Sequence, residues 1–141
     1  MNVSGASMKK NDLINLELSR CIASLGHTDT LVVADAGLPI SSETQRIDLA
    51  LTHGIPTFID TLRVVLEEMY VEKAYVSEDV LVKSPQIYQA IQSLLKNTPV
   101  EAIPHKTFKD MTRTARAVVR TGEFTPFANV ILVSGAWGFD L

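Results

Sequence analysis

Apolar and polar positions recur along this chain with two spacings, one typical of helices and one of strands. Apolar stripes at helical spacing predict helices over residues 13–25, 57–69 and 85–95. Short apolar or alternating segments predict strands at 31–36, 46–50, 71–76, 100–103, 117–120 and 130–133, and residues 107–114 fit one or two helical turns. Because strands and helices alternate, the sequence predicts a single α/β domain with a mostly parallel central sheet and helices on both faces.

Particular residues mark where these helices begin and end. Gly26 follows the first helix directly, and we expect it to end that helix in the left-handed conformation that glycine adopts at low cost. Ser84 and Pro85 are typical of an N-cap and a first helical position. Residues 1–7 are small and polar, and we interpret them as an N-terminal extension or a cloning remnant, which leaves 8–141 as the domain.

Composition narrows the classes of partner. The chain has 141 residues, of which 46% are hydrophobic and 21% charged, as in ordinary globular domains. A net charge of -3 gives no basic field to attract phosphates, so we expect no nucleic-acid partner. No apolar run is long enough to span a membrane, and the N-terminus has no secretory signal pattern, so we expect no membrane association. The mean hydropathy of +0.15 is high for a chain of this size and predicts an oligomer that buries apolar surface between subunits.

Several kinds of chemistry have no motif here. The sequence has no glycine-rich phosphate loop, no nucleophile elbow and no Cys/His cluster, so we expect neither a cofactor nor a metal. The single cysteine, Cys21, lies in an apolar helical pattern and is interpreted as a small core residue in a reducing compartment. The kinds of function that the sequence leaves open are proton-transfer chemistry and binding without catalysis.

His27 is the strongest candidate for proton transfer. It follows the first predicted helix, and the partial negative charge at a helix C-terminus favours a protonated imidazole that can act as an acid. Asp29, two residues later, could orient the ring. The alternative is that His27 only caps the last carbonyl groups of the helix.

Two further polar residues follow predicted strands, at the edge where ligands collect in open α/β sheets. Asp35 ends the first strand, where a carboxylate can accept hydrogen bonds from hydroxyl groups, and His105 follows the strand at 100–103. The alternatives are a carboxylate that caps a glycine turn and a solvated loop histidine.

The segment 120–129 joins two predicted strands and combines charged, amide and aromatic residues. Such a loop suits a carbohydrate, because rings pack on the sugar face while amide and backbone groups bind hydroxyls. The alternative is a structural loop held by an ion pair between Arg120 and Glu123.

Five motifs in order resemble the ribose pyranase/fucose mutarotase family over nearly the whole chain. They are Leu25-Gly-His-Thr-Asp29, Ala34-Asp-Ala-Gly-Leu-Pro39, Arg46-Ile-Asp-Leu49, Leu66-Glu-Glu-Met69 and Arg120-Thr-Gly-Glu-Phe-Thr-Pro-Phe-Ala-Asn129. The resemblance implies a cytoplasmic, cofactor-free isomerase that interconverts the β-pyranose and β-furanose forms of D-ribose. It also implies a ring-shaped homo-oligomer, a decamer of two stacked pentamers, with the site between neighbouring subunits.

The same resemblance implies roles for individual residues. His27 matches the proton donor, whereas the substrate-binding positions are matched by Asp35, His105, Phe127, Ala128 and Asn129. Position 127 is usually Tyr in this family, so a hydroxyl group is missing here.

A reaction scheme follows from the chemistry of the sugar. To change ring size, the hemiacetal must open, which needs a proton given to the ring oxygen and one removed from the anomeric hydroxyl. We expect His27 to give the first proton, supported by Asp29 or by groups of a neighbouring subunit, and either water or His105 to take the second. The alternatives are a mutarotase for L-fucose or another sugar, a non-catalytic sugar-binding protein, and a purely structural protein.

Overall fold

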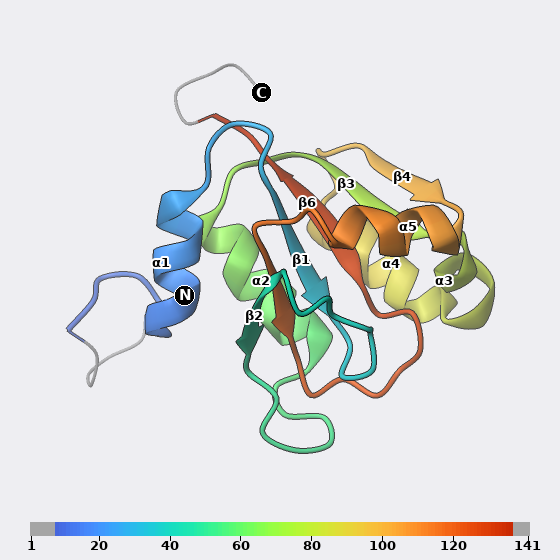
Figure 1. Cartoon of the computed structure of the whole chain (residues 1–141), viewed down its shortest axis with the longest axis horizontal. Coiled ribbons are helices and arrows are strands. Elements are labelled where there is room, and N and C mark those ends of the chain that lie inside the picture. Colours follow the sequence, from blue (N-terminus) through green and yellow to red (C-terminus); the bar gives the residue numbers. More distant parts are fainter. Residues whose placement is uncertain (1–7, 137–141) are drawn as a thin grey trace.

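A central six-stranded sheet organises the chain, and the computed structural model describes residues 8–136 of it (Figure 1). The strands are β1 (Thr30–Ala34), β2 (Gln45–Asp48), β3 (Val71–Ser77), β4 (Val100–Ile103), β5 (Ala117–Arg120) and β6 (Val130–Ser134). Their order across the sheet is β2-β5-β1-β6-β3-β4. Only β6 pairs antiparallel with its neighbours, so the prediction of a mostly parallel sheet is confirmed.

Helices cover both faces of this sheet, as predicted. The helices are α1 (Leu16–Ser24), α2 (Phe58–Glu68), α3 (Glu78–Lys83), α4 (Pro85–Leu94) and α5 (His105–Thr112). Side chains of α1 to α4 pack with Leu31 and Val33 of β1 in one core cluster, whereas Phe108 of α5 packs with Val32 and Ala34 in the other. This split follows from the strand pleat, which sends successive side chains of β1 to opposite faces.

Local capping explains where the helices begin. The Asn15 side chain accepts a hydrogen bond from the Leu18 N–H, and the Thr57 side chain accepts one from the Asp60 N–H, so α1 and α2 each start with a satisfied N-cap. Pro85 begins α4, but the Ser84 hydroxyl donates to the Pro126 carbonyl instead of capping the helix.

One expectation about local structure is wrong, and one short helix was missed. Gly26 is not left-handed, because α1 ends at Ser24 with Leu25 extended, and the positive φ of 72° falls on Thr28. Helix α3 was not predicted, since six residues directly after a strand are too few to show a helical period. The interpretation of residues 1–7 falls outside the described residues, and within 8–136 no helix is long and apolar enough to cross a membrane.

Candidate active site

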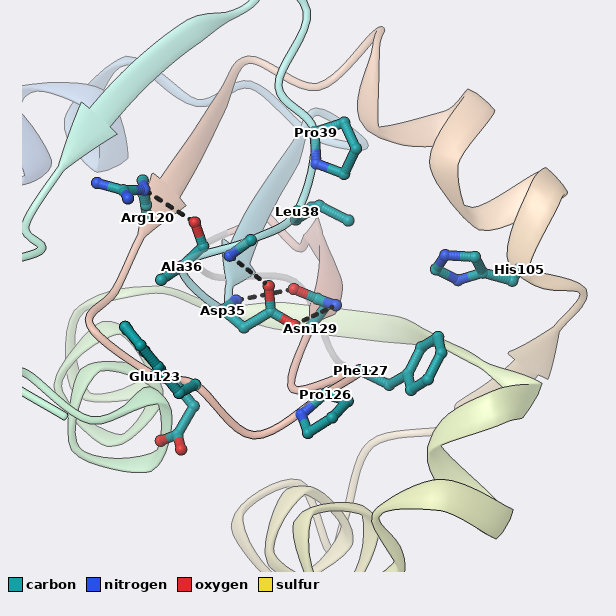
Figure 2. A pocket seen from close by; sticks show the side chains of 12 residues that line it. Asp35, Ala36, Leu38, Pro39, His105, Arg120, Glu123, Pro126, Phe127 and Asn129 are labelled. Carbon is teal, nitrogen blue, oxygen red and sulfur yellow. Dashed lines mark hydrogen bonds between the residues drawn. The ribbon is translucent and has the colours of Figure 1, made fainter. Parts of the chain in front are cut away.

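A cavity of about 530 Å³ opens at the edge of the sheet where the parallel strands end (Figure 2). Strands β1, β4 and β5 lead into it at their carboxyl ends, and antiparallel β6 begins beside it. Its walls therefore come from segments far apart in sequence: Asp35, Ala36, Gly37, Leu38, Pro39, His105, Arg120, Glu123, Phe124, Pro126, Phe127 and Asn129. This is the edge at which ligands bind in open α/β sheets.

Asp35 and Asn129 form a buried polar pair in the wall of this cavity. The Asn129 side chain is only 2% exposed and makes two contacts with Asp35. Its Oδ1 accepts the Asp35 backbone N–H at 2.8 Å, and its Nδ2 donates to Asp35 Oδ2 at 3.2 Å. The amide therefore fixes both the backbone and the carboxylate of Asp35, which makes the pair a rigid hydrogen-bonding platform.

Burial raises the pKa of the Asp35 carboxyl above its ordinary value. Hydrogen bonds from the N–H groups of Gly37, Leu38 and Phe127 and from the Asn129 amide offset part of this effect, because they favour the charged form. A carboxyl group whose pKa is raised by burial at the edge of a cleft is typical of a functional site.

His105 is held by three neighbours at the opposite side of the cavity. Its Nδ1 lies 3.0 Å from the Ser77 Oγ at the end of β3. Its ring stacks on Phe108 one turn along α5, with the centroids 6.4 Å apart, and meets the Phe127 ring edge-on at 5.1 Å. Figure 2 shows the imidazole directed from α5 towards the cavity.

The tripeptide Phe127–Asn129 runs along the cavity and begins with an unusual backbone conformation. Phe127 has a φ of 62°, in the left-handed region that bulky residues rarely adopt. Ala128 is fully buried, and its neighbours on either side, Phe127 and Asn129, line the cavity. The five predicted substrate-binding residues thus converge: four line the cavity, and Ala128 lies directly behind its wall.

The ion pair between Arg120 and Glu123, which was the alternative interpretation of this loop, does not form. Arg120 instead pairs with Asp48 at 3.2 Å and donates to the Ala36 carbonyl. Glu123 accepts the Phe58 N–H at the start of α2 and the Thr125 hydroxyl. Burial alone would raise the pKa of Glu123, but its hydrogen bonds together lower it below the ordinary value.

His27 lies at the other edge of the sheet, away from the cavity. The neighbouring Thr28 N–H donates to the carbonyl of Ser134, the last residue of β6. Strand β1 separates His27 from Asp35, and its five residues span about 16 Å. One chain therefore does not bring the predicted proton donor to the predicted sugar-binding residues.

Glu72, which the sequence did not suggest, is a carboxylate partner of His27. Glu72 Oε1 on β3 lies 2.7 Å from His27 Nε2, and the two side chains are 31% and 46% exposed. This contact holds the ring of His27 against the side chain of a residue on β3. No local pattern could have revealed it, because the two residues are 45 positions apart.

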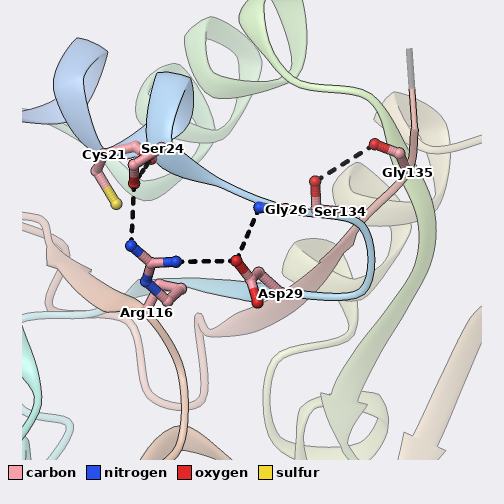
Figure 3. Close-up of polar contacts among 7 residues, drawn as sticks. All are labelled: Cys21, Ser24, Gly26, Asp29, Arg116, Ser134 and Gly135. Carbon is pink, nitrogen blue, oxygen red and sulfur yellow. Dashed lines mark hydrogen bonds and ion pairs between the residues drawn. The ribbon is translucent and has the colours of Figure 1, made fainter. Parts of the chain in front are cut away.

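Asp29, which was expected to support His27, contacts Gly26 and Arg116 (Figure 3). Its Oδ2 accepts the Gly26 N–H at 2.8 Å and pairs with Arg116 at 3.0 Å. These bonds tie the loop that carries His27 to the segment before β5. Cys21 is buried nearby, and burial raises the pKa of its thiol, so the structure agrees with a core role.

The described part of the chain holds no cluster of His, Cys, Asp and Glu side chains that could bind a metal ion. The cavity instead offers a carboxylate, an amide and an imidazole around an aromatic face. These groups can bind several hydroxyl groups of a small polyol in one orientation.

Known proteins are similar to this chain in sequence. The model of the RbsD / FucU transport protein family matches residues 8–137. A D-ribose pyranase from Chloroflexus aggregans is 56% identical over 128 residues, which make up 91% of this chain and 98% of that protein. A D-ribose pyranase from Geobacillus thermodenitrificans is 48% identical over 91% of this chain and 97% of its own length.

Two solved structures resemble this one. Bacillus subtilis RbsD complexed with D-ribose superposes with a TM-score of 0.88 at 43% identity, covering 92% of this chain and 98% of that one. The fucose mutarotase of Streptococcus pneumoniae, in complex with L-fucose, has a TM-score of 0.74 at 23% identity, covering 87% and 94%. At 23% identity, the similarity to the fucose mutarotase shows a shared fold.

Proposed function

Since this chain belongs to the RbsD / FucU transport protein family, we propose that it acts as a D-ribose pyranase. The enzyme interconverts the β-pyranose and β-furanose forms of D-ribose, which is an isomerisation without a cofactor. The observation that carries this proposal is the pair of D-ribose pyranases that match 91% of the chain at 48% and 56% identity. The match to RbsD with bound D-ribose supports the same substrate.

The cavity at the carboxyl edge is the proposed ribose site. Asp35 accepts hydrogen bonds from sugar hydroxyls, while Asn129 holds its carboxylate in place. His105 binds a further hydroxyl, and the Phe127 ring packs against the sugar face. Ala128 leaves room for the sugar beside the backbone because its side chain is small and fully buried.

The proton donor comes from a second copy of the chain in this proposal. His27 would give a proton to the ring oxygen, and it lies at the opposite edge of the sheet from the cavity of its own chain. A neighbouring subunit that places its His27 edge against this cavity supplies the missing acid. Glu72, at 2.7 Å, then orients the imidazole, whereas Asp29 stabilises the loop.

Association into a homo-oligomer is therefore part of the proposal. Leu51, Ile55 and Phe124 are large apolar side chains with more than half of their surface exposed, and Phe124 also lines the cavity. Exposed apolar side chains that lie close together are typical of a surface that another subunit covers, so they support the proposed oligomer. The ring of two pentamers and the cytoplasmic location implied by the resemblance complete the proposal.

Exchange NMR of D-ribose tests the reaction and the substrate together. Saturation of the β-pyranose signal should reduce the β-furanose signal far more with the protein than without it. A panel that includes L-fucose separates this activity from mutarotation. Ribose binding without faster exchange would show a sugar-binding protein instead.

Two matched variants test the shared site. His27→Ala and Asp35→Asn should each lose most of the exchange activity, while His53→Ala, which changes an exposed histidine stacked on Phe124, keeps it. When the two inactive variants are dissociated and reassociated together, some interfaces combine an intact His27 with an intact Asp35, and activity should return. Wild-type exchange by His27→Ala, or no recovery after mixing, would refute the donor assignment.

A further inference from the structure

We propose that Ser77 is a positioning residue that fixes the tautomer of the His105 imidazole, with the proton on Nε2. In this form, His105 donates a hydrogen bond to the sugar and does not accept the anomeric proton. The role towards the sugar rests on the proposed function, whereas the state of the imidazole follows from contacts within one chain.

The Ser77 hydroxyl is buried and has two contacts. Ser77 is 1% exposed, at the end of β3, where its Oγ caps α3 by accepting the Asp79 N–H at 3.2 Å. The other contact is His105 Nδ1 at 3.0 Å. Within residues 8–136, these are the contacts of this hydroxyl, so its own hydrogen has one available acceptor, the Nδ1 lone pair.

The two tautomers of His105 therefore differ in free energy. With the proton on Nε2, Nδ1 accepts the Ser77 hydrogen, and both groups are satisfied. With the proton on Nδ1, the serine oxygen would receive two donors, and its hydrogen would be buried without an acceptor. The penalty for such an unpaired group corresponds to roughly 5- to 150-fold in population.

Aromatic neighbours hold the imidazole ring in one orientation. Phe108 stacks on the imidazole with an interplanar angle of 9°, and Phe127 meets it at 83°. A flipped ring would place a carbon against the Ser77 oxygen and lose the hydrogen bond. Because Nδ1 faces Ser77, Nε2 lies on the far side of a ring that points to the cavity (Figure 2).

This arrangement limits what His105 can do in ring opening. An Nε2 that bears a hydrogen has no lone pair for a proton from the anomeric hydroxyl, but it can donate to a sugar oxygen. Of the two acceptors expected from the sequence, water or His105, the contacts of Ser77 exclude the second.

Nitrogen-15 NMR of the histidine rings tests the tautomer directly. At mildly alkaline pH, two-bond correlations should show that Nε2 of His105 is protonated and that Nδ1 is not. A proton on Nδ1, or equal amounts of both forms, would overturn the proposal. This readout does not depend on activity, so a protein with this tautomer but no ribose exchange would contradict the proposed function and leave the role of Ser77 intact.

Variants then connect the tautomer to sugar binding. Ser77→Ala should mix the two tautomers and raise the KM for ribose about 2- to 10-fold, with kcat changed less than about twofold. Ser77→Thr keeps a hydroxyl and should restore the tautomer and the KM. Asn15→Ala removes the N-cap of α1 and controls for the loss of a helix cap. An unchanged His105 spectrum in Ser77→Ala refutes the proposal, and if that variant does not fold, the Ser77→Thr spectrum decides.

Discussion

The Asn129→Asp substitution tests how much of the proposed ribose site depends on one amide group. In the native protein, Asn129 Nδ2 donates to Asp35 Oδ2 at 3.2 Å, and Asn129 Oδ1 accepts the Asp35 N–H. The substitution keeps the size of the side chain and the acceptor. It replaces the donor with a second carboxylate oxygen, so two buried carboxylates face each other.

The size of this perturbation follows from the 3.2 Å separation. Two unit charges at that distance repel by about 5 kcal/mol at an effective dielectric constant of ~20. The pair avoids this repulsion when it binds a proton, so the pKa of one carboxyl rises further above the value that burial already raises.

Stability should then fall as the pH rises. A folded-state pKa above the unfolded value of about 3.9 means that the native state binds more protons in this window, so the free energy of unfolding decreases by about 1.4 kcal/mol per pH unit. Between about pH 5 and about pH 7, the variant should lose about 2–3 kcal/mol relative to its own value at the lower pH, or about 5–15 °C in Tm. In the native protein, burial already raises the pKa of Asp35, so the free energy of unfolding also decreases as the pH rises, but less steeply.

Thermal unfolding over this pH range, at one protein concentration for all variants, measures the slope. The double variant Asp35→Asn/Asn129→Asp is the matched control, because an amide at position 35 can donate to a carboxylate at position 129. Its slope should be close to that of the native protein. The reasoning fails if Asn129→Asp has the native slope, or if the double variant is as pH-sensitive as the single one.

Two further substitutions test the backbone around the site. Gly122→Ala would place a Cβ 2.5 Å from the carbonyl oxygens of both Thr52 and Ile55. We therefore expect the free energy of unfolding, measured by thermal melting, to decrease by about 1–3 kcal/mol. A variant as stable as the native protein would contradict this close approach. Thr28→Asn replaces a β-branched residue at a φ of 72° with one that tolerates the left-handed region. The free energy of unfolding should therefore rise by about 0.5–1 kcal/mol in denaturant titrations. An unchanged or lower value would show that this backbone is not strained.

The sequence predicted the sheet and the convergence of the candidate sugar-binding residues Asp35 and His105 because both follow from local patterns and from strand topology. Short apolar runs marked the strands, and the rule that parallel strands end at one edge brought Asp35 and His105 to one cavity. The stripe over residues 57–69 predicted α2 to within a residue at either end. These signals are periodic or topological, so one sequence is enough to read them.

Contacts between distant segments could not be predicted in this way. Arg120 pairs with Asp48 because the two are Cα partners in the parallel register of β5 and β2, whereas Glu123, three residues along, lies beyond the strand. The contact of His105 with Ser77 spans 28 positions and depends on the β3–β4 pairing. The sequence therefore indicates the candidate side chains of the site, but not the distant residues, such as Glu72 and Ser77, that contact them.

The position of His27 at one edge of the sheet and of the cavity at the other has a consequence for assays of this protein. If these are the proposed acid and the proposed sugar site, a dissociated chain holds two incomplete halves of a catalyst. Turnover per chain should then fall when the protein is diluted below the concentration at which subunits separate, even while every chain stays folded. Specific activity against dilution would thus report the strength of subunit contact.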